Sequence, residues 1–388
     1  MKVALVGPAY PHRGGIAQFL AILDQRLRAA HDVRFFSFTR QYPSVLFPGD
    51  TQFETDEPAV KAPATRMLDS IGPASWIGTG RAIRDFGADV AIFKWWTPFF
   101  GPAFGTLARI ARQPRRDGGR TRIVLVCDNA LPHERRLIDK PFTRFMFDVT
   151  DGWVVMSEAV REELKTLLPI ERHANIRYVA HPVYQQFGAL PCDRAEARRR
   201  LGIPADHDVL LAFGYVRAYK GLHVLLDALP GIRAARAPRG VTALVVGEFY
   251  EDRAPYDEHA ARLGLTDCVR FIDHYIPDGD VGLYFAAADV VVLPYISATQ
   301  SGVVQLAYGF GRAVITTAVG GLPEMVRQGV SGLLAPPNDP PALAAAVQRF
   351  YTEKPVAEWE AGVVRERERF GWEPLIEALL GFARGPRA

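Results

Sequence analysis

Two cationic side chains, Arg217 and Lys220, stand three residues apart in the segment FGYVRAYKG. This segment directly follows residues 209–213, a continuous apolar run of the kind that forms a buried parallel strand. Ligands of parallel sheets bind beyond the carboxyl ends of the strands, and paired cations there suit a diphosphate, whose charge must be neutralised as it leaves. The pattern therefore predicts a diphosphate site, with two solvated surface cations as the alternative.

The segment PYISATQSGVVQLAYGFG offers a second group of donors. Small and hydroxylated residues precede a helical pattern that begins near Ser301. The free N–H groups and the dipole at a helix start attract anions, so Ser301 and Gly302 are predicted to join the diphosphate site. Thr299, Gln300 and Gln305 are predicted to meet hydroxyl groups of a sugar or ribose. Capping of its own helix is the simpler role for Ser301, and the two roles are compatible.

Glu324 is a further candidate for contact with the sugar or ribose. It lies in the turn TTAVGGLPEM, after two glycines and in the first turn of a short helical segment. An acidic residue in that position also stabilises a helix through the dipole, and this simpler explanation is favoured for Glu324 taken alone.

No metal site is predicted. Asp278 and Asp280 form an Asp-Gly-Asp motif that resembles the acidic motif of some metal-dependent enzymes, but they precede a helical pattern beginning near Val281. Asp is a favoured N-cap, so capping is the preferred interpretation. The three cysteines are far apart and lack metal-ligand spacing, which fits a reducing cytosol. They are Cys127, Cys192 and Cys268.

Aromatic residues gather at the end of another apolar run. Trp95 and Trp96 close the run, and Phe99 and Phe100 enter a proline turn. Part of such a group is expected in the core. The rest would line an acceptor groove or touch a membrane surface, since aromatic rings stack on sugars and sit at membrane interfaces. Trp95 and Trp96 are therefore the acceptor-side candidates.

These segments must be positioned by two series of strands and helices. Continuous apolar runs predict strands at residues 2–6, 33–38, 90–93, 123–126, 153–156 and 176–180, and again at 209–213, 243–246, 269–272, 290–293 and 314–316. Helical patterns lie between them, among others at 222–229, 281–287 and 303–310. Two βαβ series predict an α/β protein with two doubly wound parallel-sheet, Rossmann-like domains.

The domain boundary is predicted near residues 182–191, where proline and polar residues interrupt the strand pattern. The predicted division is an acceptor-side domain over 1–184, a donor domain over 185–370, and a last helix over 371–388 that returns to the first domain. Between residues 41 and 78 periodicity fails and prolines recur. This predicts a long binding loop or lid on the acceptor side.

Composition narrows the class of protein. The chain has 388 residues, of which 48% are hydrophobic and 23% charged, with a net charge of +3. These values are typical of a two-domain globular protein, and nothing in them predicts nucleic acid as a partner. No segment resembles a signal peptide or the ~20 apolar residues of a spanning helix, so a cytoplasmic location is expected. Basic runs near 109–122 and 135–144 are expected to be solvated, with peripheral contact at the inner membrane face as the minority interpretation.

Several motifs, taken in order, resemble the family 4 glycosyltransferases of GT-B fold. FGYVRAYKG is followed by LPYISATQSG, QLAYGFGRAVITT, VGGLPEMV and GVSGLLAPPND, within residues 205–345. GPAYPHRGG, FKWWTPFFGP and CDNALPHE in the first half match more loosely. The resemblance implies a retaining transferase that moves a sugar from a nucleotide-sugar donor to a glycan or lipid-linked acceptor. Polysaccharide or glycoconjugate synthesis at the cell surface is the setting it implies.

The resemblance also implies roles for particular residues. The cation pair of FGYVRAYKG would hold the donor diphosphate, and Gly14 and Gly15 would approach it from the facing domain. The nucleobase would be read largely by backbone around Glu248, Tyr275 and Ile276. The nucleotide sugar would be a co-substrate, with no further cofactor and no metal.

One departure from the family pattern concerns the donor sugar. Many members carry two glutamates separated by seven residues, and alignment on Gly311 puts Ala298 and Leu306 at those positions. No acidic residue occurs between residues 290 and 323. The ribose and sugar hydroxyls would therefore meet neutral partners, which leaves the identity of the donor sugar open.

The segment TRIVLVCDNALPHE supplies the candidate catalytic residues. Its strand pattern ends in Asp128, where related enzymes often carry a histidine, and it continues to His133 and Glu134. In retaining members of the family, the leaving phosphate is thought to take the acceptor proton. Asp128 would then stabilise positive charge at the sugar, and His133 would hydrogen-bond the phosphate or the acceptor. A loop histidine in local hydrogen bonds is the alternative for His133.

Three other classes of protein share parts of this pattern. A dinucleotide-dependent oxidoreductase is disfavoured, because GPAYPHRGG lacks the GxGxxG spacing and the second strand ends in FSFTR without an acidic residue. A GT-B epimerase acting on a nucleotide sugar and a non-catalytic nucleotide-sugar binding protein both stay open. The long proline-rich segment and the aromatic, basic first half favour a large acceptor, and therefore a transferase.

Overall fold

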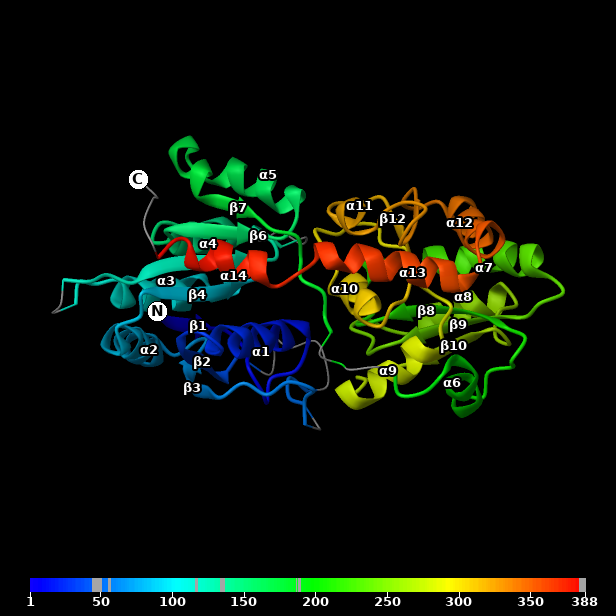
Figure 1. Ribbon diagram of the computed structural model, residues 1–388, viewed down its shortest axis with the longest axis horizontal. Coiled ribbons are helices and arrows are strands. Elements are labelled where there is room, and N and C mark those ends of the chain that lie inside the picture. Colours follow the sequence, from blue (N-terminus) through cyan, green and yellow to red (C-terminus); the bar gives the residue numbers. More distant parts are fainter. Residues whose placement is uncertain are drawn as a thin grey trace. The chain divides into compact units, whose positions relative to one another are not determined.

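The chain divides into two compact units. The computed structural model describes residues 1–43, 51–54, 57–115, 118–132, 137–185, 187 and 190–383. The first unit contains Met1–Ala180 and Trp372–Ala388, and the second contains His181–Gly371 (Figure 1). The first unit thus ends four residues before the predicted boundary at 184, and the last segment joins it from Trp372.

The first unit is built on a parallel sheet that has seven strands within the described residues, in the order β3-β2-β1-β4-β5-β6-β7 (Figure 1). The strands are β1 (Lys2–Val6), β2 (Asp32–Arg40), β3 (Ala64–Asp69), β4 (Val90–Trp95), β5 (Arg122–Cys127), β6 (Gly152–Val155) and β7 (Ile176–Tyr178). The helices are α1 (Gly15–Arg28), α2 (Pro73–Phe86), η2 (Pro98–Phe100), α3 (Gly101–Ala111), α4 (Asp139–Phe147), α5 (Glu158–Leu167), η3 (Ile170–Asn175) and α14 (Glu373–Leu380).

The second unit repeats the plan with six parallel strands in its described part, in the order β10-β9-β8-β11-β12-β13. The strands are β8 (Asp208–Phe213), β9 (Val241–Val246), β10 (Val269–Ile272), β11 (Val290–Leu293), β12 (Val314–Thr317) and β13 (Gly332–Ala335). The helices are α6 (Arg194–Arg200), η4 (Ala218–Lys220), α7 (Leu222–Arg236), α8 (Ala254–Arg262), α9 (Asp278–Ala287), α10 (Gly302–Gly309), α11 (Leu322–Met325), α12 (Pro340–Glu353), α13 (Val356–Glu366) and η5 (Arg367–Arg369).

The prediction of two doubly wound parallel sheets is confirmed, and every predicted strand overlaps an observed one. In each sheet the first strand of the unit lies in the interior and the chain winds outward to both sides, as this fold requires. Sequence analysis missed β3 and β13, which are short edge strands interrupted by polar residues or glycine. No helix within the described ranges is long and apolar enough to cross a membrane.

The segment between residues 41 and 78 was predicted to be one long loop, and this prediction is wrong. It contains β3 and the start of α2. Its residues 51–54 lie against the turn after β1, where Arg13 donates its N–H to the Gln52 carbonyl at 3.0 Å and Glu54 donates to the Pro11 carbonyl at 2.7 Å. Residues 44–50, 55 and 56 lie outside the described residues. A binding role for this segment stays a prediction.

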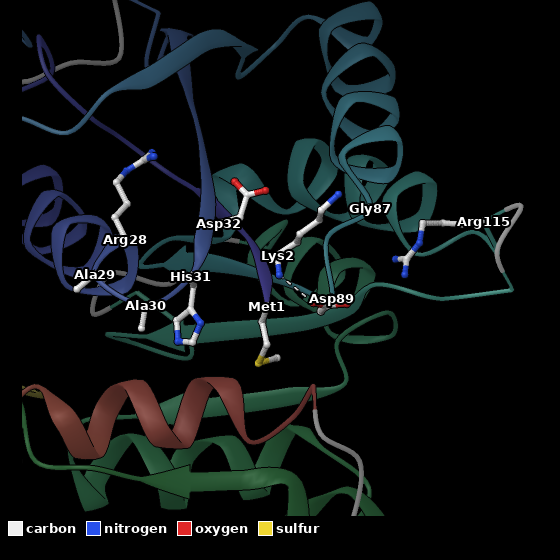
Figure 2. Close-up of a pocket in the computed structure, with 10 residues that line it drawn as sticks. All are labelled: Met1, Lys2, Arg28, Ala29, Ala30, His31, Asp32, Gly87, Asp89 and Arg115. Carbon is white, nitrogen blue, oxygen red and sulfur yellow. Dashed lines mark hydrogen bonds between the residues drawn. The ribbon is translucent and has the colours of Figure 1, made fainter.

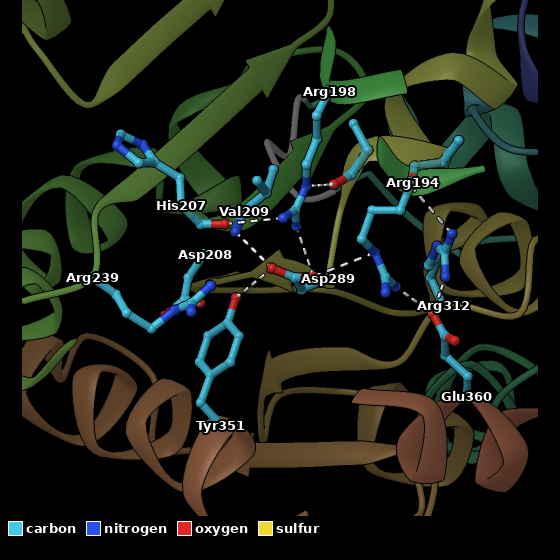
Figure 3. Close-up of polar contacts among 12 residues, drawn as sticks. Arg194, Arg198, His207, Asp208, Val209, Arg239, Asp289, Arg312, Tyr351 and Glu360 are labelled. Atoms are coloured by element: carbon cyan, nitrogen blue, oxygen red, sulfur yellow. Dashed lines mark hydrogen bonds and ion pairs between the residues drawn. The ribbon is translucent and has the colours of Figure 1, made fainter. Parts of the chain in front are cut away.

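A buried carboxylate joins the amino ends of two neighbouring strands of the second sheet (Figure 3). Asp289, directly before β11, is 5% exposed and accepts the N–H of Val209 in β8 at 2.8 Å. It also accepts from Arg198 of α6 at 2.8 Å and from the hydroxyl of Tyr351 in α12 at 3.2 Å. Burial, followed by the charge of Asp289, raises the pKa of Tyr351 well above its ordinary value.

Further ion pairs surround this carboxylate at the same edge of the sheet. Asp208, the first residue of β8, is bound by Arg236 at 2.5 Å and by Arg239 at 3.0 Å. Arg312, which precedes β12, pairs with Glu360 of α13. Burial lowers the pKa of Arg312 to about 10. The amino edge of the second sheet is thus fixed to its helices by charged hydrogen bonds.

Replacing Asp289 should destabilise the second unit. We expect Asp289→Ala to lower its free energy of unfolding by about 3–5 kcal/mol, because Arg198 stays buried without its counter-charge. The control Glu353→Ala removes one partner of an exposed pair with Arg349 and should change it by at most about 0.5 kcal/mol. Denaturant unfolding of the full chain measures both, with the two units fitted as separate transitions. Equal effects of the two substitutions would contradict a structural role for Asp289.

Candidate functional site

Three turns meet at the carboxyl edge of the second sheet. They follow β8, β11 and β12, and they are the turns that carry the predicted donor residues. Ile296 in the second turn donates its N–H to the carbonyl of Tyr219 in the first, at 2.8 Å. Gly321 in the third turn donates to the carbonyl of Thr299 in the second, at 3.1 Å. The fold therefore brings into one place segments that are far apart in the sequence.

Two glycines allow the ends of β8 and β9 to approach closely. Gly214 and Gly247 have φ values of +97° and +140°, a region that favours residues without a Cβ. A Cβ added at Gly247 would lie 2.5 Å from the carbonyl oxygen of Gly214. Beyond the glycines the two chains pair again, as a parallel bridge between Val216 and Phe249. The cationic turn is thereby held in register with the segment that follows β9.

Arg217 and Lys220 form a pair of cations at this edge. Arg217 precedes η4 and is exposed, with its guanidinium 4.9 Å from the ring centre of Tyr250. Lys220 ends η4 and is half-buried, with Nζ 5.8 Å from the ring centre of Tyr295. Across the described part of the chain, neither cation has an acidic partner. Burial, followed by the charge of Arg217, lowers the pKa of Lys220 to about 8. Such uncompensated charge favours an anionic ligand.

The start of α10 adds backbone donors beside Lys220. Ser301 occupies the N-cap, yet its side chain makes no capping hydrogen bond, and its Oγ lies 3.4 Å from the hydroxyl of Tyr295. A Cβ added at Gly214 would lie 3.4 Å from both Lys220 Nζ and Val303 Cγ2, which places the ammonium next to the first turn of the helix. The N–H groups and the dipole there attract anions. Side-chain capping, the simpler role predicted for Ser301, is therefore not observed.

The residues predicted to contact the sugar lie around the same helix at different depths. Thr299, Gln300 and Gly302 are half-buried, and Gly302 is the first residue of α10. Glu324 is half-buried in the first turn of α11. Gln305 is fully buried, and neither atom of its amide has a hydrogen-bond partner among the described residues. A buried amide without partners costs about 1–3 kcal/mol, so Gln305 lowers the stability of the unliganded fold.

Three tyrosines stack at the ends of β8, β9 and β10. The rings of Tyr215 and Tyr250 lie 4.5 Å apart at 30°, and Tyr275 lies 6.4 Å from Tyr215 at 25°. Glu248 and Ile276 were predicted, with Tyr275, to surround the nucleobase. Both are buried, and in the sequence they lie close to Tyr250 and Tyr275. Sequence analysis missed Tyr215 and Tyr250. Their signal was an aromatic residue in each of the turns FGYVR and GEFYE, next to the predicted residues.

In the first unit, the candidate catalytic Asp128 follows β5 and forms an ion pair. Its Oδ1 lies 2.6 Å from Nζ of Lys94, a residue of β4 that is 1% exposed. The same ammonium lies 3.8 Å from the ring centre of Phe19. Burial lowers the pKa of Lys94, and the charge of Asp128 opposes this shift. Sequence analysis missed Lys94, although a lysine inside an apolar strand was a signal. His133 lies outside the described residues.

Gly14 and Gly15 form the turn from β1 into α1. Gly14 is the N-cap and has a φ of +101°. A Cβ added at Gly15 would meet no atom within 4 Å, so the backbone of this turn is open to solvent. The approach of these glycines to the donor stays a prediction.

The two acceptor-side tryptophans have different environments. Trp95 is fully buried in the core of the first unit, with its ring centre 5.5 Å from that of Phe147. Its predicted place on the acceptor side is therefore wrong. Trp96 is half-buried, and its Nε1 donates to the hydroxyl of Tyr42 at 2.9 Å. Trp96 follows the end of β4, and its ring packs on that of Phe100 at 4.5 Å, at the margin of the same core.

The Asp-Gly-Asp motif lies within a helix rather than before one. Helix α9 begins at Asp278, three residues earlier than predicted, and its N-cap is Pro277. Asp278 and Asp280 thus lie in the first turn, where their charge interacts favourably with the helix dipole. The predicted capping role is wrong. Within the described ranges, no group of three or more His, Cys, Asp or Glu side chains could hold a metal ion.

A separate cavity of about 860 Å³ opens at the amino edge of the first sheet (Figure 2). Lys2, Arg28 and Asp89 are among the residues that line it. Lys2 donates to the carbonyl of Phe86 at 3.2 Å, and Arg28 pairs with Asp24 at 2.6 Å. None of the predicted site residues lines this cavity, so it is distinct from the turns described above.

Comparison with known proteins identifies the region that holds the cation pair. Residues 207–353 match the family model described as glycosyl transferases group 1. This region includes all the donor-site residues predicted in the second unit. The predicted resemblance to glycosyltransferases is thereby supported for this region, as a match to the group 1 transferases.

Curated relatives match a similar part of the chain. D-inositol 3-phosphate glycosyltransferase of Acidothermus cellulolyticus is 34% identical over 205 residues, which are 50% of this chain and 44% of that protein. The protein of the same name from Mycolicibacterium vanbaalenii is 33% identical over 246 residues, 61% of this chain and 54% of that protein. The chain thus spans about half the length of the curated relatives it matches.

Solved structures match over nearly the whole chain. HepE of Anabaena in complex with UDP superposes with a TM-score of 0.72 at 19% identity, over 99% of both chains. Sucrose-phosphate synthase of Thermosynechococcus elongatus gives a TM-score of 0.70 at 20% identity, over 99% of this chain and 97% of that one. At such identities the likeness establishes the fold alone, which is GT-B.

The lowered pKa of Lys220 predicts a pH dependence of diphosphate binding. With UDP as probe, we expect affinity to fall as the pH rises above about 8, because the free site then loses the charge of Lys220. A bound diphosphate favours the protonated amine, so affinity should fall by up to about tenfold per pH unit. Calorimetric titrations from neutral to alkaline pH measure this. In Lys220→Arg, whose guanidinium keeps its charge, the dependence should disappear. Constant affinity in the wild-type protein would remove Lys220 from the diphosphate site.

The unpartnered amide of Gln305 predicts a stabilising substitution. Gln305→Met keeps the volume and removes the buried polar atoms, so it should raise the free energy of unfolding without ligand by about 1–3 kcal/mol. Gln348→Met, on the exposed side of α12, is the control and should change it by at most about 0.5 kcal/mol. Denaturant unfolding checks both values. A destabilised Gln305→Met would show that the amide is hydrogen-bonded in solution.

Proposed function

We propose that this protein is a retaining glycosyltransferase, which moves a sugar from a nucleotide-sugar donor to a glycan or lipid-linked acceptor in cell-surface polysaccharide or glycoconjugate synthesis. The observation that carries the proposal is the cation pair Arg217 and Lys220. Within the described residues these cations have no acidic partner, and Lys220 lies beside the start of α10. Both residues fall in the region that matches the group 1 transferases.

The donor site would act on the leaving group. As the bond between the sugar and the diphosphate breaks, negative charge grows on the phosphate oxygens. Arg217, Lys220 and the N–H groups of the first turn of α10 are suited to stabilise that charge, and they do so more strongly in a part-buried site than in water. HepE, whose fold this chain shares, has been solved in complex with UDP and with UDP-glucose, which supports a nucleotide sugar as donor.

The first unit would supply a negative charge for the sugar. Asp128 is held at 2.6 Å by Lys94, whose own movement is restricted by burial and by the ring of Phe19. In the proposed reaction Asp128 stabilises the positive charge that develops at the anomeric carbon, while the leaving phosphate takes the acceptor proton. Lys94 orients the carboxylate. His133 is assigned to a hydrogen bond with the phosphate or the acceptor, and Trp96 to the acceptor.

The proposal is tested with a panel of nucleotide sugars, scored by thermal shift and by nucleotide release in the presence of candidate acceptors. A donor at about 100 times its Kd should stabilise the fold by about 2.7 kcal/mol. Lys220→Ala should lose this stabilisation and lower turnover by about 10²–10³-fold. Arg349→Ala removes an exposed cation of α12 and should leave both unchanged. Asp128→Asn should keep donor binding and lower the rate alone.

Each alternative has its own outcome in the same assays. Interconversion of nucleotide sugars without an acceptor would identify an epimerase. Stabilisation by a nucleotide sugar with neither transfer nor hydrolysis would identify a binding protein. Unchanged stabilisation and turnover in Lys220→Ala would reject the diphosphate assignment that carries the proposal.

A further inference from the structure

The segment that leads into α4, and the helix itself, expose apolar side chains to solvent. Leu137 is 98% exposed, Ile138 52% and Phe145 37%. Fully solvated leucine side chains are common on protein surfaces only as isolated residues. Here three large apolar side chains lie within nine residues of one another, in the turn that leads into α4 and on the helix.

Two cations accompany these apolar side chains. Lys140 and Arg144 are both exposed, and in the described part of the chain neither forms an ion pair or hydrogen bond. The two acidic residues of this stretch differ in exposure. Asp139 is 7% exposed and faces the unit, while Asp148 is exposed one residue beyond the helix. The exposed surface therefore combines apolar groups with an excess of positive charge.

Packing fixes which side of α4 faces outward. The buried residues follow the helical period and turn toward the unit; they are Asp139, Thr143, Met146 and Phe147. Arg109 of α3 donates to the carbonyl of Phe145 at 2.8 Å, and its guanidinium lies 3.8 Å from the ring centre of that residue. These contacts hold α4 to α3. Phe145 lies at the edge of the packed side and is 37% exposed.

We propose that this surface, which we call the α4 face and define by Leu137, Ile138, Lys140, Arg144 and Phe145, docks on an anionic lipid bilayer. Leucine, isoleucine and phenylalanine are suited to enter the boundary between headgroups and acyl chains. Lysine and arginine on the same face meet the negative phosphates of the headgroups. The inference goes beyond the proposed transferase activity and does not depend on it.

Charge and apolarity together select a bilayer over a protein partner. Leu137 and Ile138 precede Lys140, and Phe145 follows Arg144, so apolar and cationic side chains can meet a lipid surface together. Uncompensated cations next to them would disfavour an apolar protein interface, because the charges would lose hydration without a partner. At a lipid surface the same charges keep both water and phosphate contacts.

The apolar part of the proposal is tested by vesicle flotation of the full chain, with phosphatidylcholine vesicles that contain or lack phosphatidylglycerol. Wild-type protein should bind the anionic vesicles and not the neutral ones. Leu137→Ser combined with Ile138→Ser should weaken binding by at least about tenfold. Ile71→Ser combined with Ile77→Ser, which changes two exposed isoleucines near α2, is the matched control and should bind as wild type.

The charge part is tested in the same assay. Lys140→Gln combined with Arg144→Gln should weaken binding roughly fivefold for each cation removed, and added salt should weaken wild-type binding in the same direction. Arg199→Gln combined with Arg200→Gln removes two exposed cations of α6 and should have no effect. Because all these positions are exposed, melting temperatures should stay close to the wild-type value.

Three results would overturn the proposal. They are failure of wild-type protein to bind anionic vesicles, equal binding by the α4-face variants and their controls, and a wild-type dimer that the same variants dissociate in sedimentation. Stabilisation by UDP, measured on the same variants, should not change. Loss of lipid binding with normal UDP binding therefore separates this surface from the donor site, whatever the outcome of the transferase assays.

Discussion

The candidate site depends on a buried carboxylate at the opposite edge of the sheet that supports it. Asp289 binds the backbone of β8 at Val209 and holds Arg198 and Tyr351 from two helices. The strands are parallel and rigid, so contacts that fix their amino ends also fix the positions of their carboxyl ends. The turns that follow begin at those positions. The side chains that could hold a diphosphate are thus positioned by a rigid sheet, and short turns are enough to bring them together.

The second unit treats charge differently at the two edges of its sheet. Two of its buried acids, Asp208 and Asp289, lie at the amino edge and are paired there with arginines. At the carboxyl edge, Arg217 and Lys220 have no acidic partner in the described structure, and the start of α10 adds the positive end of a dipole. Burying Lys220 and placing Arg217 nearby costs free energy, which is visible in the lowered pKa of Lys220. An anion at this edge would recover that cost.

In the first unit, by contrast, the candidate catalytic acid Asp128 already forms an ion pair. Lys94 lies buried beneath Asp128 and fixes the carboxylate at the end of β5. The family resemblance predicts a histidine at the position of Asp128 in many members, whereas this chain has an ion pair there. The departure parallels the missing glutamates near α10, where neutral side chains and the unpartnered amide of Gln305 stand instead. Both changes concern residues that were predicted to surround the sugar, while the predicted cation pair, Arg217 and Lys220, is present.

The sequence by itself determined the two parallel sheets, the order of their elements and the position of Arg217 and Lys220 after a strand. These features depend on local patterns, because a buried strand needs a continuous apolar run and a turn after it needs glycine and polar residues. Tertiary structure alone decided that Trp95 is fully buried while Trp96 is half-buried, that Lys94 pairs with Asp128, and that Tyr215 and Tyr250 stack. Each of these depends on contacts between elements. Local periodicity predicts which face of an element is buried, but it does not predict which residues pack against that face. Such contacts are determined only when the elements pack together.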